Sequence, residues 1–154
     1  MDLSKPDADD PNAAHTSAEP HGSVLHIEDD PLNRALVETL LAAFTGVTLR
    51  QASNGRDGIE AALEQLPDVI LLDMNLPDIG GLEVVRALSE HITGGRCQVI
   101  LLTAEHFTIH VVKAMSLGAC EYWMKPLTLE RLRADLCRVL SGVPTQRSNT
   151  EPGK

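Results

Sequence analysis

The chain has 154 residues, with 13 Lys or Arg against 22 Asp or Glu, so its formal net charge is −9. This length corresponds to about one domain, and an apolar content of 43% suffices for one hydrophobic core without disulfides. The acidic balance argues against nucleic-acid binding and against docking on an anionic membrane, because both need a basic face. No apolar run approaches the ~20 residues of a membrane-spanning helix.

The three cysteines, Cys97, Cys120 and Cys137, are an odd number without CxxC spacing. Their pattern argues against a zinc site or a disulfide framework and predicts a reducing, cytoplasmic setting. We expect all three to be small, buried apolar residues.

The two ends of the chain are polar. Residues 1–21 are rich in Asp, Pro, Ala and Ser, and residues 142–154 have a similar composition. Both segments are predicted to be disordered tails, which leaves one folded domain at 22–141. The first segment lacks the apolar stretch of a signal peptide.

Short apolar runs alternate with segments of helical periodicity in the folded part. The runs lack polar alternation, which is typical of strands buried on both faces. The segments between them carry apolar residues three and four positions apart, as Leu32, Leu36 and Leu40 do in the first of them. The elements predicted in chain order are a strand at 24–27, a helix over 31–43, a strand at 47–49, a helix over 59–66, a strand at 69–72, a helix over 82–88, a strand at 99–102, a helix over 111–115, a strand at 122–124 and a helix over 129–140.

Boundary residues agree with these elements. Asp30 followed by Pro31 is typical of an N-cap and a first helical residue. Gly118 stands where a helix is expected to end in a left-handed conformation. The alternation of strands and helices predicts an α/β fold, (βα)5, in which a doubly wound five-stranded parallel sheet lies between two helical layers. Ligands of such sheets bind beyond the carboxyl ends of the strands.

Charged and hydroxyl residues follow four of the five predicted strands. Glu28–Asp30 follow the first, Asp73 the third, Thr103 the fourth and Lys125 the fifth. In a parallel sheet these residues converge on one edge. Clustered carboxylates need a counter-charge and suit Mg²⁺. A central carboxylate can act as a nucleophile on phosphorus, while a lysine neutralises the charge on the phosphoryl oxygens.

Four sequence blocks in order resemble the receiver domain of response regulators, over about residues 23–141. They are VLHIEDDPLNR, PDVILLDMNLPDIGGLEVVRAL, VILLTAE and GACEYWMKPL. The resemblance implies a flavodoxin-like sheet with strand order 2-1-3-4-5. It also implies a phospho-accepting signalling protein of a bacterial two-component phosphorelay, which catalyses only its own phosphorylation and dephosphorylation.

The resemblance also assigns roles at the sheet edge. Asp73 matches the phospho-acceptor, and Lys125 matches the phosphoryl-binding lysine. Glu28 and Asp29 match the acidic pair that holds Mg²⁺ (or Mn²⁺) together with Asp73 and the backbone carbonyl of Asn75. The first acid of the pair is more often Asp in the family, so we expect Glu28 to act on the metal through water.

Further roles concern switching and hydrolysis. Thr103 and Tyr122 match the switch hydroxyl and the aromatic switch residue. Asn75 and Glu105 match positions that shape the access of the hydrolytic water, and both are polar, so we expect a phosphoryl lifetime of minutes rather than hours. The bond before Pro126 is often cis in receivers. Trp123 is expected on the face opposite Tyr122, and His26 is expected to be a hydrogen-bonded core residue.

The resemblance implies partners as well. The phosphoryl donor would be a sensor histidine kinase, a phosphotransfer protein or a small donor such as acetyl phosphate. Because the tails leave no room for an output domain, we expect output through a downstream protein and the face built by 111–115, 122–124 and 129–140. This face also offers a route to a homodimer. We expect no nucleic-acid or membrane partner.

Several alternatives stay open at this point. The chain could be the receiver of a hybrid histidine kinase, although its initial Met and its tails favour a stand-alone protein. A non-phosphorylated pseudo-receiver is a second alternative, but such modules usually lose the Asp, the Lys or the acidic pair. A haloacid-dehalogenase-type phosphatase needs an Asp where Asn75 stands, and a flavodoxin needs a Ser/Thr-rich phosphate loop where three acids stand.

Overall fold

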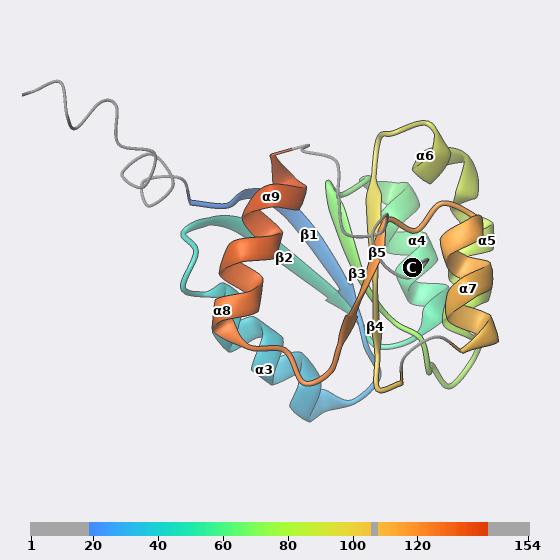
Figure 1. The fold of residues 1–154 in the computed structure, drawn as a ribbon, viewed down its shortest axis with the longest axis horizontal. Helices are drawn as coiled ribbons and strands as arrows, with labels where there is room; N and C mark the ends of the chain where they lie inside the picture. Colours follow the sequence, from blue (N-terminus) through green and yellow to red (C-terminus); the bar gives the residue numbers. More distant parts are fainter. Residues whose placement is uncertain (1–18, 106–107, 142–154) are drawn as a thin grey trace, which may run out of the picture.

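The computed structural model describes residues 19–105 and 108–141. Most of the two predicted tails, 1–18 and 142–154, lies outside the described residues. Within the described part, one five-stranded sheet lies between two groups of helices (Figure 1). No helix of this part is long and apolar enough to cross a membrane.

All five strands are parallel and follow the order β2-β1-β3-β4-β5, which confirms the predicted topology. The strands are β1 (His21–Ile27), β2 (Gly46–Ala52), β3 (Val69–Asp73), β4 (Gln98–Thr103) and β5 (Glu121–Met124). β1 begins three residues before its apolar run, because His21 and Gly22 already pair with Gly46 and Val47. The folded part therefore starts before residue 22, and the predicted tail of 1–21 was too long at its end.

The helices follow the strands in the predicted order. They are α3 (Pro31–Leu41), α4 (Gly55–Glu64), α5 (Gly81–Ala87), α6 (Ser89–Thr93), α7 (Ile109–Ser116), α8 (Leu129–Arg131), the π-helical turn η1 (Leu132–Leu136) and α9 (Cys137–Leu140). Asp30 caps α3 by accepting a hydrogen bond of 2.9 Å from the N–H of Leu32. Gly118 has a φ of +123° just after α7, as its position predicted.

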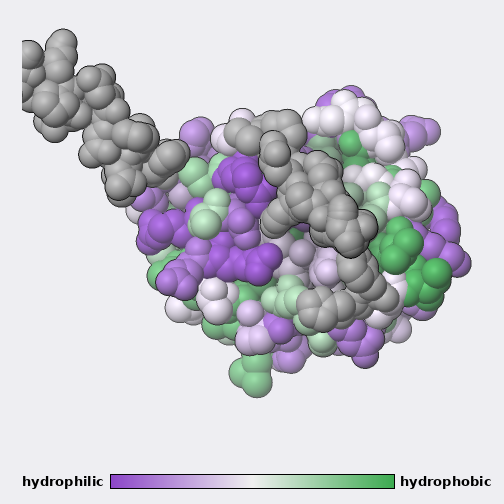
Figure 2. Space-filling view, viewed as in Figure 1, coloured by the Kyte–Doolittle hydropathy of each residue, from purple (hydrophilic) through white to green (hydrophobic). Residues whose placement is uncertain are grey.

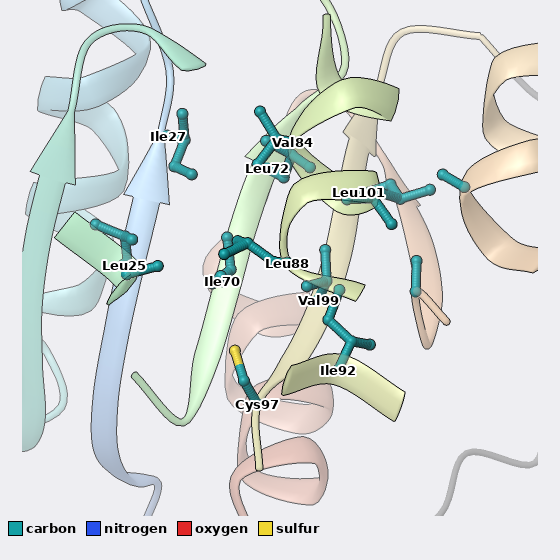
Figure 3. Close-up of a cluster of buried hydrophobic side chains, with 14 of the residues drawn as sticks. Leu25, Ile27, Ile70, Leu72, Val84, Leu88, Ile92, Cys97, Val99 and Leu101 are labelled. Carbon is teal, nitrogen blue, oxygen red and sulfur yellow. The ribbon is translucent and has the colours of Figure 1, made fainter. Parts of the chain in front are cut away.

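Two hydrophobic clusters cover the two faces of the sheet. One cluster packs under α4 to α7 (Figure 3). The other packs under α3 and the segment α8–α9, with Phe44 and Trp123 among its largest buried side chains. Successive strand residues alternate between the clusters, so Leu25 and Ile27 belong to the first and Val24 to the second. The sheet is thus buried on both faces, as the apolar runs predicted.

The apolar spacing in the first helix was misleading. Leu32 and Leu36 are 78% and 38% exposed, whereas Val37 and Leu41 are buried. Both sets have helical spacing, and the second is continuous with Phe44, which fills the cluster below the helix. The buried face of α3 is thus the one that lies on the same side as Phe44.

The structure also corrects the interpretation of the cysteines. Cys97 is buried, and its burial raises the pKa of the thiol to about 12. Cys120 and Cys137 are only partly buried.

Candidate functional site

The candidate site lies at the carboxyl ends of β1, β3, β4 and β5, toward the lower edge of Figure 1. Lys125, which follows β5, connects two carboxylates from neighbouring strands. Its Nζ lies 3.3 Å from Oδ1 of Asp73 and 3.2 Å from Oε1 of Glu28. The parallel order β1-β3-β4-β5 brings these residues together although they are far apart in sequence.

Three carboxylates form the centre of the site. Glu28, Asp29 and Asp73 each offer an oxygen, and these oxygens lie within 4.8 Å of one another. Glu28 and Asp73 are buried, while Asp29 is exposed. A compact set of carboxylate oxygens that is open on one side fits a hard divalent cation, which keeps water on its remaining positions.

Hydrogen bonds from Arg34 of α3 and from the N-cap residue Asp30 hold Glu28 and Asp29 in place. Nη1 of Arg34 donates to the carbonyl of Glu28 at 2.8 Å and to that of Asp29 at 3.0 Å. The N–H of Asp30 donates to Oε2 of Glu28 at 3.2 Å. The acidic pair is therefore fixed at the start of α3.

Burial and charge shift the acidity of the site. Burial raises the pKa of Asp73 to about 6, although Lys125 and the N–H of Asn75 act against this shift, and the Glu28 carboxylate adds to it. For Lys125, burial disfavours the ammonium, but the carboxylates of Asp73 and Glu28 outweigh this effect and raise its pKa. At neutral pH the site thus holds a charged lysine between carboxylates that repel each other.

The site opens on both sides of the sheet edge. A pocket of about 540 Å³ on the side of α5 and α7 is lined by Asp29, Asn75 and Thr103, among others. A smaller pocket of about 290 Å³ on the side of α3 is lined by His26, Glu28 and Lys125, among others. The carboxylate centre lies between these two openings.

The hydroxyl of Thr103 is engaged with its own loop. It donates to the carbonyl of Glu105 at 2.8 Å and accepts from the N–H of Glu105 at 3.0 Å. Thr103 is buried and lines the larger pocket beside Ala104 and the exposed Glu105. To bond a group on Asp73, its O–H must leave the carbonyl of Glu105.

Tyr122 and Trp123 lie on opposite faces of β5, as predicted. Tyr122 is half-buried and packs against the cluster under α5 and α7. Trp123 is fully buried in the other cluster. Tyr122 pairs with Leu101, two residues before Thr103, so Tyr122 and Thr103 belong to the same face of the sheet.

Two further predicted features lie beside the centre. Asn75 is exposed, and its backbone N–H donates to Oδ1 of Asp73 at 3.2 Å. The metal role of its carbonyl stays a prediction. The Lys125–Pro126 bond is cis, as expected from the resemblance.

The response regulator receiver domain family matches residues 24–136, which include every residue of the site. The chain belongs to this family. Receiver domains are signalling proteins rather than ordinary enzymes, and they bind Mg²⁺ in general. The cluster of Glu28, Asp29 and Asp73 is where this receiver could hold the ion.

Curated relatives agree with the family. The nitrate/nitrite response regulator protein NarL of Escherichia coli (strain K12) is 35% identical over 121 residues, which cover 78% of this receiver chain and 55% of that protein. The transcriptional regulatory protein AfsQ1 of Streptomyces coelicolor is 38% identical over 118 residues, covering 77% and 51%. The chain thus spans about half the length of the curated relatives it matches.

Solved structures agree with the fold. Chemotaxis protein CheY4 of Vibrio cholerae superposes with a TM-score of 0.70 at 28% identity, covering 78% of this chain and 99% of that one. A response regulator receiver domain protein from Clostridium thermocellum gives a TM-score of 0.66 at 26% identity, covering 79% and 92%. Both comparisons support the flavodoxin-like architecture of this receiver.

His26 and Gln51 lie beside the site, and neither residue was predicted to act on it. Nδ1 of His26 lies 3.1 Å from Nε2 of Gln51, so His26 is the hydrogen-bonded core residue that was expected. The register of β1 and β2, which places Gln51 opposite His26, determines this pair. Glu28 follows His26 by two residues and therefore lies on the same face of the chain. This i, i+2 spacing is the sequence signal that could have placed His26 beside the acidic pair.

Proposed function

We propose that the chain is the phospho-acceptor of a two-component phosphorelay, with Asp73 as the residue that receives the phosphoryl group. The observation that carries this proposal is the position of Lys125. Its ammonium contacts both Asp73 and Glu28, inside a cluster of three carboxylates. A buried carboxylate beside a metal-binding acidic pair and a lysine is the arrangement that phosphoryl transfer to Asp requires.

The transfer starts with the attack of a carboxylate oxygen of Asp73 on phosphorus. With a phosphohistidine donor, a P–O bond forms while the P–N bond breaks. The imidazole leaves with the electron pair of that bond, as a neutral ring whose other nitrogen carries the proton. Mg²⁺, held by Glu28, Asp29, Asp73 and the carbonyl of Asn75, supplies positive charge for the phosphoryl oxygens when it is bound.

The residues of the chain then respond to the added charge of about −1.5 to −2. Lys125 pairs with the phosphoryl group, and the hydroxyl of Thr103 turns from the carbonyl of Glu105 toward it. Tyr122, on the same face of the sheet, moves toward the space that Thr103 leaves. This repacking changes the surface built by α7, β5 and α8–α9 as a shift between two populations.

The output surface carries exposed apolar residues. Ile109 and Val112 on α7 are 61% and 48% exposed, and Figure 2 shows hydrophobic side chains gathered in this part of the molecule. We propose that a downstream protein or a second copy of the chain binds here. The comparisons do not support our expectation that nucleic acid plays no role, because the relatives include transcriptional regulatory proteins. The cytoplasmic location stays a prediction.

Labelling by phosphoramidate, a small donor with a P–N bond, tests the acceptor. The chain is incubated with the donor and Mg²⁺, the acyl phosphate is reduced at once with borohydride to a stable alcohol, and the modified residue is located by peptide mass spectrometry after digestion. We expect the label on Asp73 and no label on the neighbouring Glu28 or Asp29. A label on either neighbour, with Asp73 unmodified, contradicts the proposal.

A further inference from the structure

Two buried polar atoms next to the site face each other without a hydrogen bond. They are Nε2 of His26 and Oε1 of Glu28, which lie 4.0 Å apart. His26 is 0% exposed and Glu28 is 1% exposed. Oε1 lies 3.2 Å from the ammonium of Lys125, whereas Nε2 of His26 has no hydrogen-bond partner among the described residues. Buried polar atoms are seldom left in this way, because an unmade hydrogen bond costs free energy.

The neighbours of His26 determine which of its ring nitrogens carries the proton. Nε2 of Gln51 donates to the backbone carbonyl of Arg34 at 3.0 Å, and a carbonyl can only accept. This contact fixes the orientation of the Gln51 amide. The same NH₂ group lies 3.1 Å from Nδ1 of His26, so Nδ1 must accept. The proton of the neutral ring is therefore on Nε2, the nitrogen that points toward Glu28.

We propose that His26 is a positioning residue for Glu28, to whose Oε1 its Nε2–H group donates through one water in the smaller pocket. This inference rests on the proposed function, because it assigns Glu28 to the metal-binding acidic pair. Both side chains line the pocket of about 290 Å³, and a water from it reaches the two atoms once the Glu28 carboxylate turns slightly, because both atoms are closed to solvent in this conformation. A separation of 4.0 Å is too long for a direct hydrogen bond but suits one bridging water.

The physical consequence concerns the orientation of the carboxylate. Glu28 has one more rotatable bond than Asp and needs more restraint to present a fixed face to a cation. Its Oε2 is held by the N–H of Asp30, and His26 would restrain Oε1. Groups that hydrogen-bond to metal ligands typically change metal affinity 10- to 100-fold when they are removed.

The tautomer of His26 can be measured directly in the wild-type chain. A long-range ¹H–¹⁵N spectrum of the full chain, recorded without Mg²⁺, distinguishes the two neutral forms of histidine. The chain has six histidines, and the signal of His26 is identified by its loss in His26→Gln. We expect the proton on Nε2. A proton on Nδ1 overturns the inference, because Nε2 could then not donate.

Calorimetric titration with Mg²⁺ alone tests the effect on the site. His26→Leu removes the donor with similar side-chain volume, and His26→Gln keeps an N–H donor near the position of Nε2. We expect His26→Leu to weaken Mg²⁺ binding about tenfold and His26→Gln to stay within about threefold of wild type. Equal affinities for the two variants overturn the inference.

A third variant separates this inference from the proposed function. Asp29→Asn removes a carboxylate of the acidic pair itself and must weaken Mg²⁺ binding if the metal site is where we place it. If Asp29→Asn has no effect, the metal site and the proposed function fail together. If Asp29→Asn weakens binding while His26→Leu does not, only the role of His26 fails.

Discussion

The ammonium of Lys125 lies 3.3 Å from Oδ1 of Asp73, although 52 positions separate these residues in the chain. The contact exists because β3 and β5 flank β4 in a parallel sheet and end at the same edge. Lys125 also contacts Glu28 at 3.2 Å, so one cation serves two buried carboxylates. The electrostatic balance of the site therefore depends on this side chain.

Replacing Lys125 by Met is expected to destabilise the fold and to impair labelling of Asp73. Two buried carboxylates then lose their shared cation, which we expect to lower the free energy of unfolding by about 1–3 kcal/mol in EDTA, since Lys125 is partly exposed. Urea unfolding measures this loss. Added Mg²⁺ is expected to stabilise the variant more than the wild type. Lys113→Met, on the exposed side of α7, is the matched control and should stay within about 0.5 kcal/mol. Equal losses in both variants contradict the account.

Asp73→Asn is expected to make the fold more stable at neutral pH. The folded-state pKa of Asp73 is raised to about 6 from an ordinary 3.8. The stability that protonated Asp73 contributes is therefore fully present below pH 3.8 and is lost as the pH rises through about 6. The ionised group costs about 2–3 kcal/mol at pH 7.5. Urea unfolding in EDTA should therefore show no difference between variant and wild type near pH 4 and a gain of this size at pH 7.5.

Because His26 also changes stability with pH, the quantity to compare is the difference in free energy of unfolding between Asp73→Asn and the wild type. Burial lowers the pKa of His26 to about 4 from 6.5, so its contribution is complete above pH 6.5 and is lost as pH falls through about 4. This trend opposes that of Asp73 and flattens the wild-type curve. Both proteins carry His26, so its effect cancels in the difference. A difference that stays constant with pH rules out a raised pKa at Asp73.

Two neighbouring glycines after β3 are expected to respond differently to substitution. A Cβ on Gly81 would lie 2.8 Å from Sδ of Met74 and 3.1 Å from the carbonyl of Asp73, so Gly81→Ala should cost about 1–3 kcal/mol. Gly80, the N-cap of α5, has open space around it, so Gly80→Ser should change stability by a few tenths. Thermal unfolding of the pair measures both effects. Similar melting temperatures would mean that the loop after Asp73 is not closely packed.

The phosphoryl group on Asp73 is expected to be lost within minutes. Glu105 is exposed at the mouth of the larger pocket and can orient the attacking water, and the small Ala104 leaves the path open. Glu105→Leu should lengthen the half-life several-fold without a change in the free energy of unfolding. Decay of the phosphorylated mass after removal of the donor measures the lifetime. A wild-type half-life of many hours is incompatible with this role.

Much of the fold and of the site could be predicted from the sequence. Buried parallel strands have few polar residues, so the acids, the threonine and the lysine stand out at their carboxyl ends. The alternation of strands and helices then places Glu28, Asp73 and Lys125 at one edge, as the structure shows. Residue type and the parallel sheet predict one shared edge, and the strand order that the resemblance to receiver domains implied makes the residues neighbours there.

Other features depend on packing that the sequence pattern does not specify. The buried face of α3 could not be chosen, because Leu36 and Val37 both belong to sets with helical spacing. The sequence pattern made no prediction for Glu121, which is buried and accepts hydrogen bonds from Arg138 at 2.8 Å and from Trp123 at 2.9 Å. The contact of His26 with Gln51 depends on the exact register of β1 and β2. Such pairs follow from three-dimensional register rather than from local spacing.

The most direct test of the account is the intact mass of the full chain after incubation with acetyl phosphate. The wild type with Mg²⁺ is compared with the wild type in EDTA and with Asp73→Asn. We predict a gain of one phosphoryl group in the wild type with Mg²⁺ and no gain in the other two samples. A gain that persists in Asp73→Asn contradicts the central claim. Failure of the wild type to accept phosphoryl from acetyl phosphate and from a panel of histidine kinases contradicts it as well.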